Sequence, residues 1–323
     1  MRSIVFILMF LSCSSAGLAA SDGQQGKSPA IVFAGVEEGG KILGASDEFV
    51  RRLSPFDRAA RMKTDQAVSE EVYLAFVTEN VLPWTDSEKA TVQQAVEVVR
   101  EGLSGFSLNF PEPVFFVKTT GREEGGAAYT RDSAVILPKS QIHISRGRFQ
   151  HLIAHELLHV LTRNDVALRE SLYEAIGFKP CNEIAFPKAL APRKITNPDA
   201  PRNDHYLQVS WRGRQVCVVP ILFAREDKYD VNRGGEFFNY LVFKLLVVHQ
   251  GPSGPWVPVY EGEEPVLLEV GQVSRFYEQV GRNTGYIIHP EEIIADNFAL
   301  IATGKRTVAS PEVLERIEQV LAK

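Results

Sequence analysis

The sequence lacks two features that would narrow its function at once: a block of basic residues and a long apolar run. Its formal net charge is −5, and without a concentrated positive patch nucleic acid is not expected as a partner. No segment beyond the N-terminus is long and apolar enough to span a bilayer, so no transmembrane span is expected. With 45% hydrophobic and 23% charged residues, the chain has the composition of a soluble globular protein.

The first twenty residues have the pattern of a secretory signal peptide. Arg2 supplies a positive charge, residues 4–11 form a short apolar run, and small residues lead to a cleavage site near Ala20. We therefore expect an exported protein, either periplasmic or secreted. Cys13 ends "LSC", part of a bacterial lipobox, so a lipid anchor at this cysteine is the alternative, although Phe10 stands where an aliphatic residue is usual.

Cysteine is also scarce. The chain has three cysteines, and only Cys181 and Cys217 lie outside the predicted signal peptide. Neither stands in a recognisable nucleophile motif, so catalysis by cysteine is not expected. An even number of cysteines in an oxidising compartment predicts one disulfide between them. Two buried free thiols are the alternative.

The length of 323 residues is enough for one large domain or two smaller ones. We expect residues 21–44, rich in Gly, Ser and Gln, to form a flexible leader, and residues 45–323 to form a single α+β unit. A capping box from Thr85 to Glu88 predicts a helix that ends near Gly102.

Strands are expected both before and after the middle of the chain. The segment "AAYTRDSAVILP" predicts a hairpin that turns near Asp132, with its second strand over residues 134–137. A strand-rich stretch is expected over about residues 180–285. The apolar run at residues 237–248 fits a buried helix or a strand equally well.

The segment "QHLIAHELLHV", within a predicted helix over residues 146–162, contains the motif His-Glu-x-x-His. His155 and His159 are four residues apart and share a helix face, where they present two imidazoles to one zinc ion. Glu156 is offset by one position and can reach a metal-bound water without binding the metal, which suits a general base. The motif arises by chance in roughly one in a hundred chains of this length, so an ordinary helix with core histidines is the alternative. His151 is expected beside the site or at the surface.

The third protein ligand does not follow from the motif alone. In the metzincin pattern, H-E-x-x-H-x-x-G-x-x-H, a glycine and a histidine would stand where this chain has Thr162 and Asp165. That family also needs a methionine turn downstream of the zinc helix. The three methionines here are all upstream, at positions 1, 9 and 62. The metzincin pattern is therefore excluded, and Asp165 remains a minor candidate ligand.

Two later helices offer carboxylates. Glu170 and Glu174 lie on the helix after the motif, but the same stretch also has the pattern of a plain amphipathic helix whose glutamates are solvated. A helix much further along contains Glu292 and Asp296, four residues apart and therefore on one face. Glu292 is the preferred zinc ligand, with Asp296 accepting the free N–H of a zinc-bound histidine. The alternative interpretation is the acidic first turn of an ordinary helix.

His-Glu-x-x-His followed by Glu-x-x-x-Asp resembles the gluzincin zinc metallopeptidases. The stretch "EIIADNF" is similar to the E-x-x-A-E-x-F segment of the anthrax lethal factor-like branch. This resemblance implies a zincin-like catalytic domain with N-terminal helices, in which Zn²⁺ is the cofactor. By position it implies the ligands His155, His159 and Glu292, with Glu156 as the base and Asp296 supporting a histidine.

The resemblance also implies that a tyrosine shortly before the third ligand stabilises the oxyanion. Tyr286 stands in that region, and His289 is the alternative donor. The separation of His159 from Glu292 departs from the family pattern, in which only a few tens of residues lie between motif and third ligand. A strand-rich insertion between the zinc helix and the third-ligand helix is therefore expected.

The activity that follows is zinc-dependent hydrolysis of peptide bonds in a peptide or protein substrate. Zincins commonly bind the substrate as an added strand along an edge strand just before the zinc helix. Here that places Tyr129, Arg131 and Ala134 in contact with the substrate, with an ordinary hairpin surface as the alternative. A non-catalytic zinc-binding envelope protein or scaffold is the alternative function, and the presence of Glu156 disfavours it.

Overall fold

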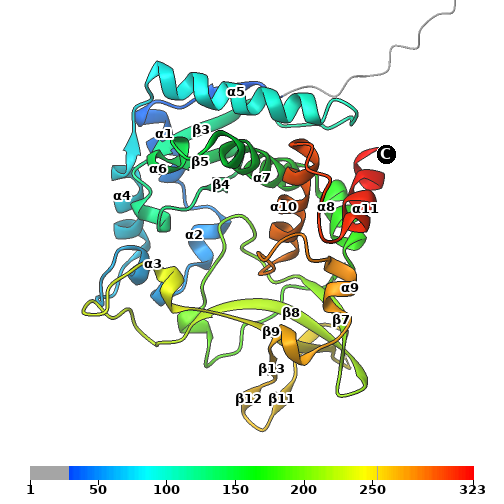
Figure 1. Ribbon diagram of the computed structural model, residues 1–323. Coiled ribbons are helices and arrows are strands. Elements are labelled where there is room, and N and C mark those ends of the chain that lie inside the picture. The colour runs from blue at the N-terminus through cyan, green and yellow to red at the C-terminus, as the bar shows by residue number, and fades with distance from the viewer. Residues whose placement is uncertain (1–28, 253) are drawn as a thin grey trace, which may run out of the picture.

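The structure, a computed structural model, describes residues 29–252 and 254–323. The predicted signal peptide and the lipid anchor at Cys13 therefore lie outside the described residues. Over the described ranges the chain combines helices with two main β-sheets, as expected of an α+β protein. Figure 1 shows one sheet among the helices in the upper half of the view and the other sheet at the bottom.

The N-terminal sheet has the strand order β1 (Ile31–Phe33), β3 (Val114–Thr119), β5 (Ala134–Pro138) and β4 (Tyr129–Arg131), and β2 (Val81–Leu82) also pairs with β3. The first three strands are parallel, whereas β4 runs antiparallel to β5. The predicted hairpin is thus confirmed. It makes β4, and not β5, the edge strand of this sheet.

The prediction of a flexible leader over residues 21–44 is wrong for its described part. Strand β1 pairs with β3, and the helix α1 (Val36–Leu43) follows it with Leu43 fully buried. The stretch is too short to show a period, and its pairing partner is distant in sequence, so composition alone misled the prediction. A Cβ on Gly39 would lie 2.9 Å from Val117, so glycine lets α1 approach the sheet closely.

Helices on the N-terminal side frame this sheet. They are α2 (Glu48–Arg52), α3 (Pro55–Arg61), α4 (Glu70–Glu79) and α5 (Asp86–Gly102). The helix predicted from the capping box is confirmed, because Thr85 caps α5 and the Glu88 carboxylate binds back to the Thr85 N–H. In Figure 1, α5 crosses the top of the molecule above β3 and β5.

The histidine motif lies on a helix at the centre of the fold. After the short α6 (Lys139–Ile142), the chain forms α7 (Arg146–Asn164), and every residue of α7 from Ile153 to Thr162 is buried. A helix that is buried on all sides is a core element rather than a surface helix. It packs against α5 on one side and against α10 (Pro290–Ala302) on the other.

Three further helices complete the helical part: α8 (Val166–Ala175), α9 (Phe276–Val280) and α11 (Pro311–Leu321). Both α8 and α11 pack near α10, as the right side of Figure 1 shows. None of the helices in the described parts of the chain is long and apolar enough to cross a membrane.

Between α8 and α10 the chain is rich in strands, as expected. The second sheet has the strand order β10 (Trp256–Pro258), β9 (Leu241–Gln250), β8 (Arg214–Ala224), β7 (His205–Trp211) and β6 (Phe178–Pro180), and β13 (Leu267–Leu268) also pairs with β9. A small hairpin joins β11 (Tyr260–Glu261) to β12 (Glu264–Pro265). The apolar run at residues 237–248, whose pattern fits a buried helix or a strand equally well, forms a 3₁₀ turn, η3 (Phe237–Tyr240), followed by β9. Other 3₁₀ turns are η1 (Arg122–Glu124), η2 (Ala191–Arg193) and η4 (Val270–Gln272).

The disulfide expected between Cys181 and Cys217 is not formed in the structure, where both are free, half-buried cysteines. They pack with the apolar side chains on the outer face of the second sheet. Burial raises the pKa of Cys181 to about 12 and also raises the pKa of Cys217. Both sulfurs are therefore poor nucleophiles at neutral pH.

The close approach of α5 to α10 gives the first prediction. A Cβ on Gly102 would lie 1.9 Å from the backbone oxygen of Ala302. We expect Gly102→Ala to lower the free energy of unfolding by about 1 to 3 kcal/mol through overpacking, although alanine is the better helix former. The control is Gly105→Ala, because a Cβ there meets nothing within 4 Å. Urea unfolding followed by circular dichroism measures both, and equal stability of the two variants contradicts the prediction.

Candidate metal centre

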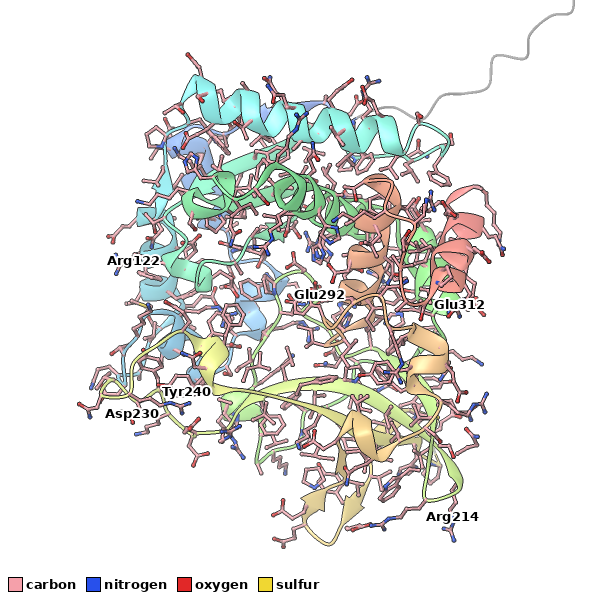
Figure 2. The ribbon with its side chains drawn as sticks, in the orientation of Figure 1. Arg122, Arg214, Asp230, Tyr240, Glu292 and Glu312 are labelled. Atoms are coloured by element: carbon pink, nitrogen blue, oxygen red, sulfur yellow. The ribbon has the colours of Figure 1, made fainter. Side chains whose placement is uncertain are left out.

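Three predicted ligands meet where α7 crosses α10. His155 and His159 present their rings from one face of α7, and Glu292 reaches them from the first turn of α10. Glu292 Oε2 lies 3.1 Å from His155 Nε2 and 3.6 Å from His159 Nε2. One donor atom from each of these three residues lies within 4.8 Å of the donor atoms of the other two. Figure 2 shows Glu292 in the middle of the molecule, between the upper helices and the lower sheet.

A carboxylate stands behind each histidine. Asp296 Oδ1 lies 2.9 Å from His155 Nδ1, and Glu291 Oε1 lies 2.9 Å from His159 Nδ1. A carboxylate that accepts the Nδ1–H leaves the Nε2 lone pair free for a metal and holds the ring in place. The expected position of Asp296 is thus observed. Glu291 has the same relation to the other histidine, which the sequence did not reveal because an acid fits the first turn of any helix.

The donor set fits a metal ion. His159 Nε2 is buried and has no hydrogen-bond partner among the described residues. Leaving such a nitrogen without a partner costs free energy, and a bound cation satisfies it. Two imidazole nitrogens and one carboxylate, with room for a further ligand, are the set that zinc takes in catalytic sites.

The electrostatics of the three ligands couple metal binding to proton release. Burial alone would lower the pKa of His155, but its hydrogen bonds to Asp296 and Glu292 raise that pKa to about 10. The pKa of His159 is also raised against the effect of burial, by its acidic neighbours Asp199 and Glu292. Burial would raise the pKa of Glu292, and the two histidines hold it well below its ordinary value. A metal must displace these protons, so its affinity falls as the pH falls.

Glu156 lies beside this group without joining it. Its side chain is 2% exposed, and its Oε2 has no hydrogen-bond partner among the described residues. Burial and the neighbouring carboxylate of Asp199 raise the pKa of Glu156 to about 8. A carboxylate with a pKa near neutrality can take up a proton and release it again, as a general base must.

Tyr286 lies at the site, as expected of an oxyanion donor. Its ring stacks on that of His155 with centroids 6.3 Å apart. Desolvation of its hydroxyl, together with the charges of Glu292 and Asp199, raises the pKa of Tyr286 well above its ordinary value. The hydroxyl therefore keeps its proton and can donate it in a hydrogen bond.

His289, the alternative donor, is not available for that role. It caps α10, and its Nδ1 accepts a hydrogen bond from the Glu291 N–H at 3.1 Å. Its Nε2 lies 3.2 Å from the Arg202 carbonyl oxygen. Burial lowers the pKa of His289 to about 4, so the ring is neutral and both nitrogens serve the fold. The prediction of His289 as a donor is wrong for this reason.

The other candidate ligands lie elsewhere. Glu170 Oε2 lies 2.9 Å from His205 Nε2, Glu174 is exposed on α8, and Asp165 caps α8 by accepting from the Leu168 N–H. Of the candidate ligands, the structure brings only Glu292 to the histidine pair. His151 stands at the edge of the site, with Nε2 3.5 Å from Asp296 Oδ1.

The three predicted substrate contacts are buried, which corrects that prediction. Tyr129 and Ala134 are each 2% exposed and belong to a hydrophobic cluster. Arg131 is also 2% exposed, and its guanidinium binds the Asp47 carboxylate and the Ala45 carbonyl. The reason is that α1 and α2 cover the face of the hairpin that these side chains occupy.

A cleft of about 470 Å³ opens onto two of the candidate ligands, His155 and Glu292. Ala127 and Ala128, just before β4, line one side, and His155, Glu156 and Tyr286 line another. The backbone at the start of the edge strand is therefore the part of the predicted hairpin that faces the site.

Two residues at the site escaped prediction altogether. Asp199 belongs, with Glu156 and His159, to a second group of donor atoms within 4.8 Å of one another. The Asn197 side-chain amide donates to Glu292 Oε1. Both come from the irregular, proline-rich stretch after η2, where no periodicity relates a residue to a face. No signal in the sequence could have placed them.

Comparisons of the chain with models of known protein families, with curated proteins and with solved structures give no match. The function must therefore be argued from the site itself.

The carboxylates behind the histidines give a second prediction. We expect Asp296→Asn and Glu291→Gln each to weaken zinc binding by about 10- to 100-fold, because the Nδ1–H loses its charged acceptor. The matched controls are Asp227→Asn and Glu174→Gln, since both side chains are exposed. Competition against a coloured zinc chelator measures the affinities. Unchanged affinity in both site variants contradicts a supporting role for these carboxylates.

Proposed function

We propose that this chain is an exported, zinc-dependent metallopeptidase with a zincin-like domain of the gluzincin pattern. The buried Nε2 of His159, which has no hydrogen-bond partner among the described residues, is the observation that carries the proposal, because it lies close to both His155 Nε2 and the Glu292 carboxylate. The paired carboxylates behind the histidines support it further. They orient the rings as metal-binding histidines are usually oriented.

Each side chain around the site has a chemical part in amide hydrolysis. Zinc held by His155, His159 and Glu292 supplies Lewis acidity, which makes water more acidic and a carbonyl more electrophilic. Glu156 takes a proton from the attacking water and passes it to the departing amine. The Tyr286 hydroxyl donates a hydrogen bond to the oxygen that becomes negatively charged.

The position of the cleft supports a peptide as the substrate. It is lined by Ala127 and Ala128, which lead into β4, the edge strand, and an extended chain can be bound as an added strand beside such an edge. Such pairing holds a peptide by its main chain, which every sequence possesses. An edge strand beside a general base is therefore suited to hydrolysis of peptide bonds.

The test is a digest of a peptide library by the zinc-loaded chain, read by mass spectrometry. We expect cleavage that stops when a chelator removes the metal and returns when zinc is added back. A chain that keeps one zinc ion but cuts no peptide would contradict the proposal. That outcome would favour a non-catalytic zinc-binding envelope protein or scaffold.

A further inference from the structure

The chain segment that carries Asp199 forms part of the cleft wall. The segment at residues 195–201 is fixed to the fold at several points. The Thr196 N–H binds the Asp57 carboxylate at 3.0 Å, and Arg61 donates to the Thr196 carbonyl at 3.1 Å. From α7, Arg163 donates to the Asp199 carbonyl at 3.2 Å. The segment is thus a built wall of the site.

This wall prevents a further strand from pairing along the whole of β4. Asp199 Oδ1 accepts hydrogen bonds from the Thr130 N–H at 2.7 Å and from Thr130 Oγ1 at 2.6 Å. Backbone groups of neighbouring residues in a strand point to opposite sides, so Thr130 is the residue of β4 whose N–H faces the edge. Ala128 lines the cleft. A peptide in the cleft can therefore reach Ala128, but it cannot pair with the Thr130 N–H, which Asp199 occupies.

The cleft is lined by charged side chains of both signs. Asp199 lines the cleft. Its carboxylate accepts hydrogen bonds from the neutral groups of Thr130, and Arg163 binds its backbone carbonyl. The exposed Arg148 and Lys305 line the cleft as well. Neither of these two cations forms an ion pair with another described residue. A peptide amino terminus suits Asp199, whereas a carboxylate suits Arg148 or Lys305.

We propose that the cleft takes a peptide by its free amino terminus, with Asp199 accepting hydrogen bonds from the ammonium group, so that the enzyme removes residues from that end. This inference rests on the proposed peptidase function. Water adds across the first peptide bond, whose C–N bond breaks. The released amino acid keeps the new carboxylate, and the shortened peptide takes up a proton at its new amino group.

Distance favours the α-amine over a lysine side chain. The amine nitrogen and the carbonyl carbon of one residue lie about 2.5 Å apart, whereas the four-carbon stem of lysine places its ammonium roughly 6 Å from its own carbonyl. The Asp199 carboxylate falls within 4.8 Å of the donor atoms of Glu156 and His159. An anchor this near the reacting centre fits the first residue of a chain.

The first experiment compares two forms of one peptide, with a free and with an acetylated amino terminus, as substrates of the zinc-loaded full chain. We expect the free peptide to be shortened from its amino end, and acetylation to lower kcat/KM roughly 10- to 100-fold through loss of a charge-assisted bond. Equal internal cleavage of both forms overturns the inference and leaves the peptidase proposal standing. Cleavage governed by an internal lysine, with or without acetylation, also overturns it.

Variants assign the effect to Asp199. We expect Asp199→Asn to keep one zinc ion per chain and to bring the two peptides within about threefold of each other, while the exposed Asp227→Asn control keeps the full preference. Loss of zinc from Asp199→Asn would make Asp199 a metal ligand and overturn the inference. Thr130→Val removes one of the two bonds that hold Asp199 but keeps its charge, and we expect an intermediate preference.

A binding measurement separates this inference from the proposed function. Calorimetry with zinc-loaded Glu156→Gln needs no turnover. We expect the free peptide to bind roughly 10- to 100-fold more tightly than the acetylated one. Equal affinity overturns the amine site, whether or not the unaltered chain cleaves peptides.

Discussion

Replacing Glu156 with glutamine is expected to leave the zinc content unchanged and to lower the rate of peptide hydrolysis at least about 10³-fold. Glutamine has nearly the same shape but cannot take up a proton at neutral pH. Glu156 does not belong to the group formed by His155, His159 and Glu292, so its loss should leave the ligands in place. Zinc content by atomic absorption and cleavage by mass spectrometry give the two readouts.

The matched control for this change is Glu174→Gln, which alters an exposed glutamate on the neighbouring helix α8. It should keep the activity of the unaltered chain. Two results would contradict the assignment of Glu156. Hydrolysis that survives in Glu156→Gln would mean that another group acts as the base, and loss of zinc in that variant would mean that Glu156 binds the metal.

The parts of the fold that could be predicted from sequence are those whose information is local. The capping box at Thr85, the helix around the histidine motif and the hairpin that turns near Asp132 all depend on neighbouring residues, and each is observed. Strand β1 depends on pairing with β3, which lies far along the chain. Its composition suggested a leader because no local pattern records that pairing.

The candidate site divides in the same way. His155 and His159 follow from helical spacing alone, and Asp296 follows from Glu292 by the same spacing. Glu292 is preferred over Glu170 because Asp296 shares its helix face, and the resemblance to the gluzincins supports the same choice. Asp199 needed the structure, since a loop without periodicity gives no face on which to place a side chain.

Because so many acidic side chains are buried at the site, the stability of the fold should depend on the bound metal. Glu156, Glu291 and Glu292 are each at most 2% exposed, and buried carboxylates are stable only when they are paired or bind a cation. In the metal-free protein, protons on the two histidines balance part of this charge. A zinc ion replaces those protons with a fixed double charge, so metal and fold should stabilise each other.

Glu292→Gln is therefore expected to weaken zinc binding by roughly 10²- to 10³-fold, since one of three protein ligands loses its charge. The amide keeps the shape of the side chain and can still meet Asn197, which now donates to Glu292 Oε1. Stabilisation by zinc at a fixed concentration should fall by about 3 to 4 kcal/mol, because each tenfold loss of affinity removes about 1.4 kcal/mol.

Thermal unfolding with and without zinc measures the stabilisation, and competition with a chelator measures the affinity. Glu174→Gln and Glu170→Gln are the controls, because each removes the charge of one of the two alternative candidate ligands on α8. If either of these lost zinc while Glu292→Gln kept it, the third ligand would lie on α8 and the crossing of α7 with α10 would not form the metal centre. If only Glu292→Gln loses zinc, the third ligand comes from α10, beyond the strand-rich stretch that separates it from the histidine motif in the sequence.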